Sequence, residues 1–210
     1  MKFVRAWLLF ILSAGPAFAG EYSESLLFIQ PEFGYQATRI FTNSQSAGYT
    51  GLALGGSVYY KIGDEDFAFA PFVSYTIGSY NSGANSAVQT ETQKERTVGA
   101  GLKLYFGKLF LRANYVWMSV KNESQGLVTQ TISDSSTGLG GGIGIVFPVS
   151  SYVKIEVSGD VQNVSFKANP SGFTSASQVL RFGGTLGISV LLPSSAPRRT
   201  YQLKTSSPKD

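Results

Sequence analysis

The side chains that most often perform catalysis or bind metals are missing from this chain. Its 210 residues include no histidine and no cysteine, which excludes Ser–His and Cys–His nucleophiles, thiolate metal sites and disulfides. Ser151 and Lys154 match a bare Ser-x-x-Lys spacing, but the partner motifs of penicillin-recognising enzymes are absent. Glycine-rich stretches at 99–101, 138–144 and 183–187 complete no nucleotide-binding loop. We therefore expect no enzyme activity, no cofactor and no bound metal.

Charged side chains are the remaining candidates for a functional site, and they are scarce. They make up 14% of the chain, against roughly 25% in an ordinary soluble domain. A buried charge is costly unless it is paired and hydrogen-bonded. If the segments that carry these charges enclose a common interior, the sequence predicts an ionic network there. Its expected members are Glu32, Lys61, Lys103, Arg112, Lys154, Glu156, Asp160 and Arg181.

The segments that carry these charges have the two-residue period of β-strands. In each segment an apolar face that is free of charge along most of its length alternates with a face of small, polar and charged residues. Each segment is about as long as a tilted strand needs to be to cross a bilayer. Together they predict an all-β fold of eight strands, at 26–41, 50–62, 67–78, 97–106, 109–118, 138–147, 153–162 and 179–192.

The period alone leaves the direction of the apolar faces open. A water-soluble sandwich or lipocalin-like barrel alternates in the same way but turns its apolar face inward. The low charged fraction and the glycine-rich polar face favour the opposite arrangement, with the apolar face toward lipid. In 138–146 four glycines share one face, which would make a poor apolar core but leaves room for Arg and Lys side chains in a lumen.

The connections between the segments alternate strictly between short and long. The short links are 63–66, 107–108 and 148–151, and the long ones are 42–49, 78–96, 119–137 and 163–178. Tight periplasmic turns and longer extracellular loops are typical of closed up-and-down transmembrane barrels. Closure is required because an unpaired strand edge is not tolerated in hydrocarbon, and eight strands enclose an interior just wide enough for side chains to fill.

The two ends of the chain differ from its middle. Residues 1–19 have the form of an export signal, with Lys2 and Arg5 before a short apolar run and an Ala-x-Ala cleavage site at Ala17–Ala19. Residues 193–210 form a basic tail that we expect to be disordered in the periplasm. Between them, 20–192 holds 11 basic and 12 acidic residues. Neither end interleaves aromatic with basic residues, so nucleic acid is not an expected partner.

Aromatic residues are expected near both rims of the barrel, as in the girdles at membrane interfaces. The outer girdle would comprise Tyr35, Tyr75, Tyr115 and Trp117, and the periplasmic girdle Tyr60, Phe67, Phe106 and Phe147.

Over residues 22–192 the pattern resembles that of the small eight-stranded outer-membrane barrels of Gram-negative bacteria, the OmpA-like transmembrane domain and OmpX-like proteins. Thr185, Gly187, Val190 and Leu192 resemble the last-strand signal read by the outer-membrane assembly machinery, although that signal commonly ends in an aromatic residue at the chain terminus. The resemblance implies an integral outer-membrane protein. The enzymes among such barrels (lipid A deacylases, palmitoyl transferases, phospholipases and omptin-type proteases) use a catalytic histidine, which this chain lacks.

From these observations we expect a monomeric outer-membrane barrel with a structural and surface-interaction role and a lumen plugged by the charged network. Its partners would be outer-membrane lipid and lipopolysaccharide, the assembly machinery, and an extracellular ligand bound through the loops. The alternatives are a small passive channel, mildly anion-preferring because five basic residues face three acidic ones, and a soluble secreted β-barrel binder.

Overall fold

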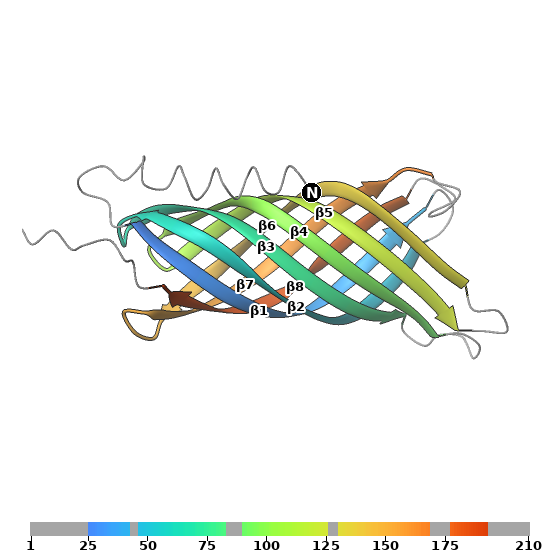
Figure 1. Ribbon diagram of the computed structural model, residues 1–210, viewed down its shortest axis with the longest axis horizontal. Helices are drawn as coiled ribbons and strands as arrows, with labels where there is room; N and C mark the ends of the chain where they lie inside the picture. Colours follow the sequence, from blue (N-terminus) through green and yellow to red (C-terminus); the bar gives the residue numbers. More distant parts are fainter. Residues whose placement is uncertain (1–24, 43–45, 83–89, 126–129, 169–176, 193–210) are drawn as a thin grey trace, which may run out of the picture.

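The computed structural model describes residues 25–42, 46–82, 90–125, 130–168 and 177–192. The predicted export signal and basic tail lie outside these residues. The described part is built entirely of strands that wind around a common axis (Figure 1). None of its elements is an apolar helix of membrane-spanning length. The strands are β1 (Ser25–Phe41), β2 (Ser46–Gly63), β3 (Phe67–Ser82), β4 (Thr90–Phe106), β5 (Leu109–Gln125), β6 (Gln130–Pro148), β7 (Val153–Phe166) and β8 (Ser177–Leu191).

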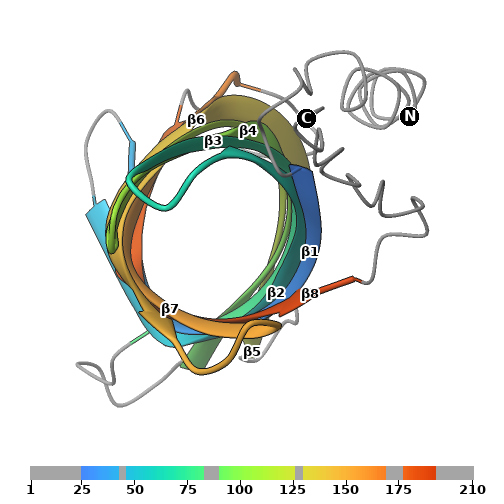
Figure 2. The ribbon, with the colours of Figure 1, turned by 90° about the vertical axis from the view of Figure 1, so that its left-hand side faces the viewer.

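The eight strands form a closed barrel, which confirms the predicted fold class. Each strand pairs antiparallel with its neighbours in sequence, and β1 pairs with β8 to close the ring, from Phe28 opposite Leu191 to Phe41 opposite Gln178. An end-on view shows the continuous wall that results (Figure 2). Closure pairs the backbone groups of both terminal strands, which is the condition for a sheet to exist in hydrocarbon.

Tight turns join the strands at one end of the barrel. Gly63 and Gly107 adopt positive φ values of 127° and 59°, a region that residues with a Cβ rarely enter. In the first turn, Oδ1 of Asp64 accepts hydrogen bonds from the backbone N–H groups of Phe67 (2.7 Å) and Asp66 (3.0 Å). The bond from Phe67 contributes most to lowering the pKa of the Asp64 carboxyl. These local bonds let the chain reverse direction in a few residues.

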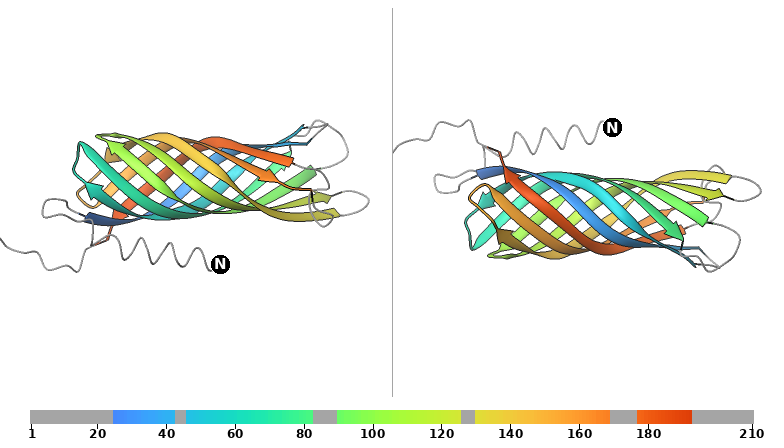
Figure 3. Two further views of the ribbon diagram at one scale, coloured as in Figure 1. Left: turned by 90° about the horizontal axis from the view of Figure 1, so that it is seen from above. Right: turned by 90° about the horizontal axis from the view of Figure 1, so that it is seen from below.

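At the other end the strands run further than the sequence predicted, and this corrects the predicted long loops. Residues 78–96 were expected to form a loop, but β3 and β4 remain paired as far as Asn81 opposite Thr92. Likewise β5 and β6 remain paired as far as Ser124 opposite Gln130. The protruding strand ends are visible in two further views (Figure 3). The apolar period stops where the wall leaves the lipid, whereas the backbone pairing continues in water.

The exterior of the barrel is apolar, as the sequence predicted. Leu139, Ile143 and Phe33 expose 68%, 59% and 46% of their surfaces, whereas Glu156 exposes only 2%. A water-soluble barrel would have the reverse arrangement. An outward-facing belt of Ile, Leu, Val and Phe is stable only where acyl chains cover it, so the wall spans a membrane.

The interior is more apolar than the small, glycine-rich lumen that the sequence suggested. Two clusters of buried apolar side chains lie inside the wall. The lower cluster, toward the tight turns, comprises Phe28, Tyr59, Ala68, Ala70, Phe72, Tyr105, Phe110 and Val146. The upper cluster, toward the opposite end, comprises Ile40, Tyr49, Tyr80, Val116, Met118, Val120, Val164, Phe166 and Val179. Polar and charged groups therefore share the interior with packed apolar side chains.

Candidate functional site

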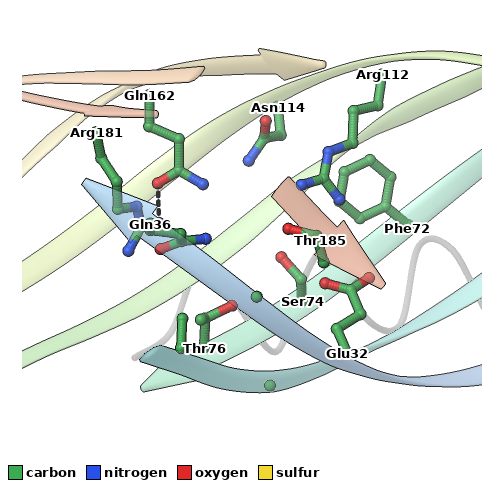
Figure 4. A pocket seen from close by; sticks show the side chains of 13 residues that line it. Glu32, Gln36, Phe72, Ser74, Thr76, Arg112, Asn114, Gln162, Arg181 and Thr185 are labelled. Atoms are coloured by element: carbon green, nitrogen blue, oxygen red, sulfur yellow. Dashed lines mark hydrogen bonds between the residues drawn. The ribbon is translucent and has the colours of Figure 1, made fainter. Parts of the chain in front are cut away.

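A polar layer lies between the two apolar clusters. Along β1, Gln36 falls between Phe28 and Ile40, and along β5, Asn114 falls between Phe110 and Val116. The layer encloses a cavity of about 20 Å³, which is room for about one water molecule. Figure 4 shows the lining side chains converging on this space from several strands. Charged residues on its lining are Glu32, Arg112 and Arg181.

The carboxylate of Glu156 accepts five hydrogen bonds inside the barrel. Its Oε1 accepts hydrogen bonds from Tyr59 (3.0 Å), Tyr105 (3.1 Å) and Ser189 (3.1 Å). Its Oε2 accepts from Lys103 (2.9 Å) and from Nε2 of Gln30 (3.0 Å). These donors come from β1, β2, β4 and β8. One carboxylate on β7 therefore ties together four other strands.

Lys103, the cationic partner of Glu156, is enclosed by aromatic rings. Its Nζ lies 4.4 Å from the centroid of the Tyr59 ring and 5.5 Å from that of Phe110, within the range of cation–π attraction. It also donates a hydrogen bond to Oε1 of Gln30 at 2.6 Å. The side chain is only 1% exposed. The ammonium group has thus exchanged water for a carboxylate, an amide and π faces.

A second ion pair joins β8 to β4 inside the barrel. Nη1 of Arg181 lies 3.0 Å from Oε2 of Glu95 and donates a weaker bond to the Thr97 hydroxyl at 3.3 Å. Arg181 also donates to Gln162. The other oxygen of Glu95 accepts a bond from Gln93 at 2.8 Å. Because both charged side chains are almost fully buried, each depends on the other for stability.

The third ion pair depends on a glycine. Nε of Arg112 on β5 lies 2.7 Å from Oδ1 of Asp160 on β7, although β6 runs between these strands. The residue of β6 that lies opposite both is Gly142. A Cβ at this position would overlap the Asp160 carboxylate. The glycine-rich face of β6 therefore provides the space that lets Arg112 reach its partner.

The other three residues of the expected network are placed differently. Glu32 borders the cavity and accepts a hydrogen bond from the Ser57 hydroxyl at 3.0 Å. Lys61 donates to the backbone carbonyl of Asp64 at 3.2 Å. Lys154 lies 5.1 Å from the centroid of the Phe28 ring. Within the described part of the chain, none of the three forms an ion pair. Within the described residues the interior thus holds three direct ion pairs. Glu32 is linked to the Lys103–Glu156 pair, because the Ser57 hydroxyl lies within hydrogen-bond distance of both Glu32 and Gln30.

Glu95, which forms a buried ion pair with Arg181, is not among the network residues predicted from the sequence. It fell within the predicted loop 78–96, and no apolar alternation around it indicated a strand. One pattern in the sequence could have placed Glu95 on a strand. Gln93, Glu95 and Thr97 alternate with the basic residues Lys94 and Arg96. The first three are buried and the other two exposed. With Glu95, the expected set of eight charged residues becomes nine, five of them basic and four acidic.

The aromatic residues expected at the rims lie on the outer surface of the wall. Tyr35 and Tyr115 expose 59% and 56% of their surfaces, and Phe67, Tyr75, Phe106, Trp117 and Phe147 are also exposed, whereas Tyr60 is half-buried. The rings of Phe67 and Phe106 lie 5.4 Å apart between centroids.

The residues of the predicted assembly signal lie in and just after the last strand, β8. Thr185 and Gly187 point inward and Val190 points outward. The backbone N–H of Leu192 donates a hydrogen bond to the Leu27 carbonyl at 2.8 Å.

An exposed charge cluster on the outer surface provides a test by titration. Glu123 pairs with Lys121 (2.8 Å) and with Lys94 (2.9 Å) near the far ends of β4 and β5. Hydrogen bonds from Lys121 and Lys94 lower the pKa of Glu123 to about 2. The carboxylate is therefore expected to stay ionised as the pH falls from 4.5 toward 2, and the two pairs should be lost only near the lower value. A carboxyl-carbon NMR titration of Glu123 measures this, and a midpoint near 4.5 would contradict the pairing.

A solved structure with a TM-score above 0.5 shares the fold of this chain. No family model and no curated protein matches the chain. Among solved structures, Neisserial surface protein A is 15% identical with a TM-score of 0.51, over 79% of this chain and 97% of that one. The attachment invasion locus protein Ail of Yersinia pestis is 16% identical with a TM-score of 0.47, over 78% and 98%. A major outer membrane protein of Thermus thermophilus is 15% identical with a TM-score of 0.44, over 77% and 99%.

The chain thus has the fold of the small outer-membrane barrels. Closed barrels with an apolar exterior are the architecture of bacterial outer-membrane proteins, and the wall described above has both properties. The protein is an integral outer-membrane β-barrel with eight strands.

Proposed function

We propose that this barrel has a structural and surface-interaction role and that its interior is closed to ions. The observation that carries the proposal is the filling of the interior by two apolar clusters, with the polar layer between them. An ion crossing the barrel would have to displace packed aromatic and aliphatic side chains at two levels. The strand ends that extend past the apolar belt would then present the surface that contacts extracellular partners.

The charge balance of the interior supports this proposal over an anion-preferring channel. The excess of basic residues in the sequence prediction falls once Glu95 is included. Three of the five cations are also neutralised by direct ion pairs, to Glu156, Asp160 and Glu95. Selective pores keep a ring of unneutralised charge of one sign, whereas here opposite charges meet directly.

The proposal predicts that the purified protein is electrically silent in planar bilayers. A heat-modifiable band shift on detergent gels would show that the inserted barrel is folded, so that a flat trace reports a closed lumen rather than a denatured sample. We expect no discrete current steps at applied potentials on the order of 100 mV. Reproducible steps from the folded protein would overturn the closed-lumen proposal and support the passive-channel alternative. A reversal potential in a salt gradient would then report the ion preference.

A further inference from the structure

Three cations gather on the outer surface of the barrel, beyond the apolar belt. Lys94 and Arg96 point outward from β4, and Lys121 points outward from β5. Lys94 lies directly opposite Lys121 in the strand register, and Arg96 lies opposite Ser119 on one side and Ile77 on the other. Arg96 is thus a diagonal neighbour of Lys121, a relation that places side chains roughly 7–8 Å apart. We call these three residues the basic cluster.

The basic cluster is only partly neutralised by the protein. Like charges directly opposite each other on a sheet are unfavourable, and Lys94 and Lys121 reduce this cost by sharing Glu123. Arg96 forms no ion pair within the described residues. Three cations and one carboxylate leave a net charge of +2. The Lys94 and Lys121 side chains are 55% and 50% exposed, so an external anion can reach them.

The cluster adjoins the surface that faces lipid. One step along the strands from Arg96, Val98 lies opposite Trp117 on one side and Tyr75 on the other. Trp117, Tyr75 and Ile77 are 48%, 50% and 45% exposed. An aromatic and aliphatic surface therefore continues directly into a cationic one, at the level where lipid headgroups meet acyl chains.

We propose that the basic cluster binds the phosphate group of an anionic outer-leaflet lipid whose acyl chain lies along Ile77, Val98 and Trp117. The planar guanidinium of Arg96 can bind a phosphate through two parallel hydrogen bonds, and Lys94 and Lys121 add point charges beside it. A soluble anion could meet the charges but would leave the adjoining apolar surface unused. This inference rests on the part of the proposed function that places the barrel in a membrane, and not on the closed lumen. Current steps in planar bilayers would therefore overturn the closed lumen without contradicting lipid binding.

Diphosphoryl lipid A is a suitable probe, because it carries both phosphate groups and acyl chains. The chain has two tryptophans, Trp7 and Trp117. Because Trp7 lies in the predicted export signal, the emission of the processed protein reports on Trp117 beside the cluster. The folded protein in non-ionic detergent would be titrated with lipid A, and with inorganic phosphate in parallel. We expect saturable binding of lipid A and no comparable binding of phosphate. Equal binding of inorganic phosphate would overturn the lipid assignment.

Three variants test the residues. Arg96→Gln is expected to weaken lipid A binding about fivefold, the order of effect of one cation at a membrane surface, and the triple variant with Lys94→Gln and Lys121→Gln should weaken it further. Glu123→Gln should strengthen binding, because it removes the competing carboxylate. Arg39→Gln is the matched control, since it removes an exposed cation from β1, where its paired neighbours are Gly48 and Leu180. Unchanged affinity in the triple variant, an equal loss in the control, or no gain with Glu123→Gln would overturn the proposal.

Discussion

Replacing Lys103 with methionine is expected to lower the free energy of unfolding by about 3–5 kcal/mol, the usual cost of removing one partner from a buried ion pair. The methionine fills much of the same space, but it leaves the Glu156 carboxylate buried without its cation. The other four hydrogen bonds to that carboxylate cannot supply a positive charge. Urea unfolding of the purified protein in detergent micelles, followed by the heat-modifiable gel shift, measures the difference.

The double variant Lys103→Met/Glu156→Gln separates loss of charge pairing from loss of packing. Glutamine keeps an oxygen that can accept bonds from Tyr59 and Tyr105 but carries no charge, so the double variant should recover part of the lost stability. Lys108→Met is the matched control, because Lys108 is exposed in a tight turn and its loss should change stability little. A single variant as stable as the wild type would show that the Lys103–Glu156 pair contributes nothing to the fold.

The wall of the barrel could be predicted from sequence because lipid imposes a simple rule on it. Every second residue must be apolar where the wall meets acyl chains, and this gives the alternation of Leu102 and Leu104 with Lys103. The same rule fixes which face each residue occupies, since a shift of one residue would turn every side chain to the other face. The strand count, the antiparallel order and the sidedness all follow from it.

Outside the lipid the rule ends, and the prediction failed there. Around Glu95 the outer face of β4 meets water and the inner face carries Gln93, Glu95 and Thr97, so neither face shows an apolar alternation. The pairing of Glu95 opposite Val120 is held by backbone hydrogen bonds, which leave no mark in the pattern of side chains. The expected loops were therefore too long, and a buried charge was assigned to one of them.

The apolar clusters of the interior were missed for a different reason. On β5, Val116 and Met118 point inward while Tyr115 and Trp117 point outward, so both faces are apolar and periodicity cannot distinguish them. Which inward residues meet across the barrel depends on strand tilt and stagger, which a single sequence does not specify. A single sequence likewise does not specify which acidic residue each buried cation pairs with. Lys103 and Arg112 are cross-strand neighbours, yet they pair with acids four residues apart on β7.

Replacing Arg181 with methionine is also expected to lower the free energy of unfolding by about 3–5 kcal/mol, because it too removes one partner from a buried ion pair. Glu95 would remain buried on β4 with bonds from Gln93 and Thr38 but without a cation. The double variant Arg181→Met/Glu95→Gln should recover part of the loss, and Arg39→Met is the control, because that arginine points outward and is exposed. Urea unfolding compares these variants, together with the single variant Glu95→Gln, with the wild type.

This comparison also tests the strand assignment of residues 90–97. If that segment were a solvated loop, Glu95 would lie in water and the two changes would act independently, so that their effects on stability would simply add. A buried pair instead requires the double variant to lose less than the sum of the single variants. Additive losses would therefore contradict the Arg181–Glu95 pair, and with it the extension of the barrel wall beyond the apolar belt.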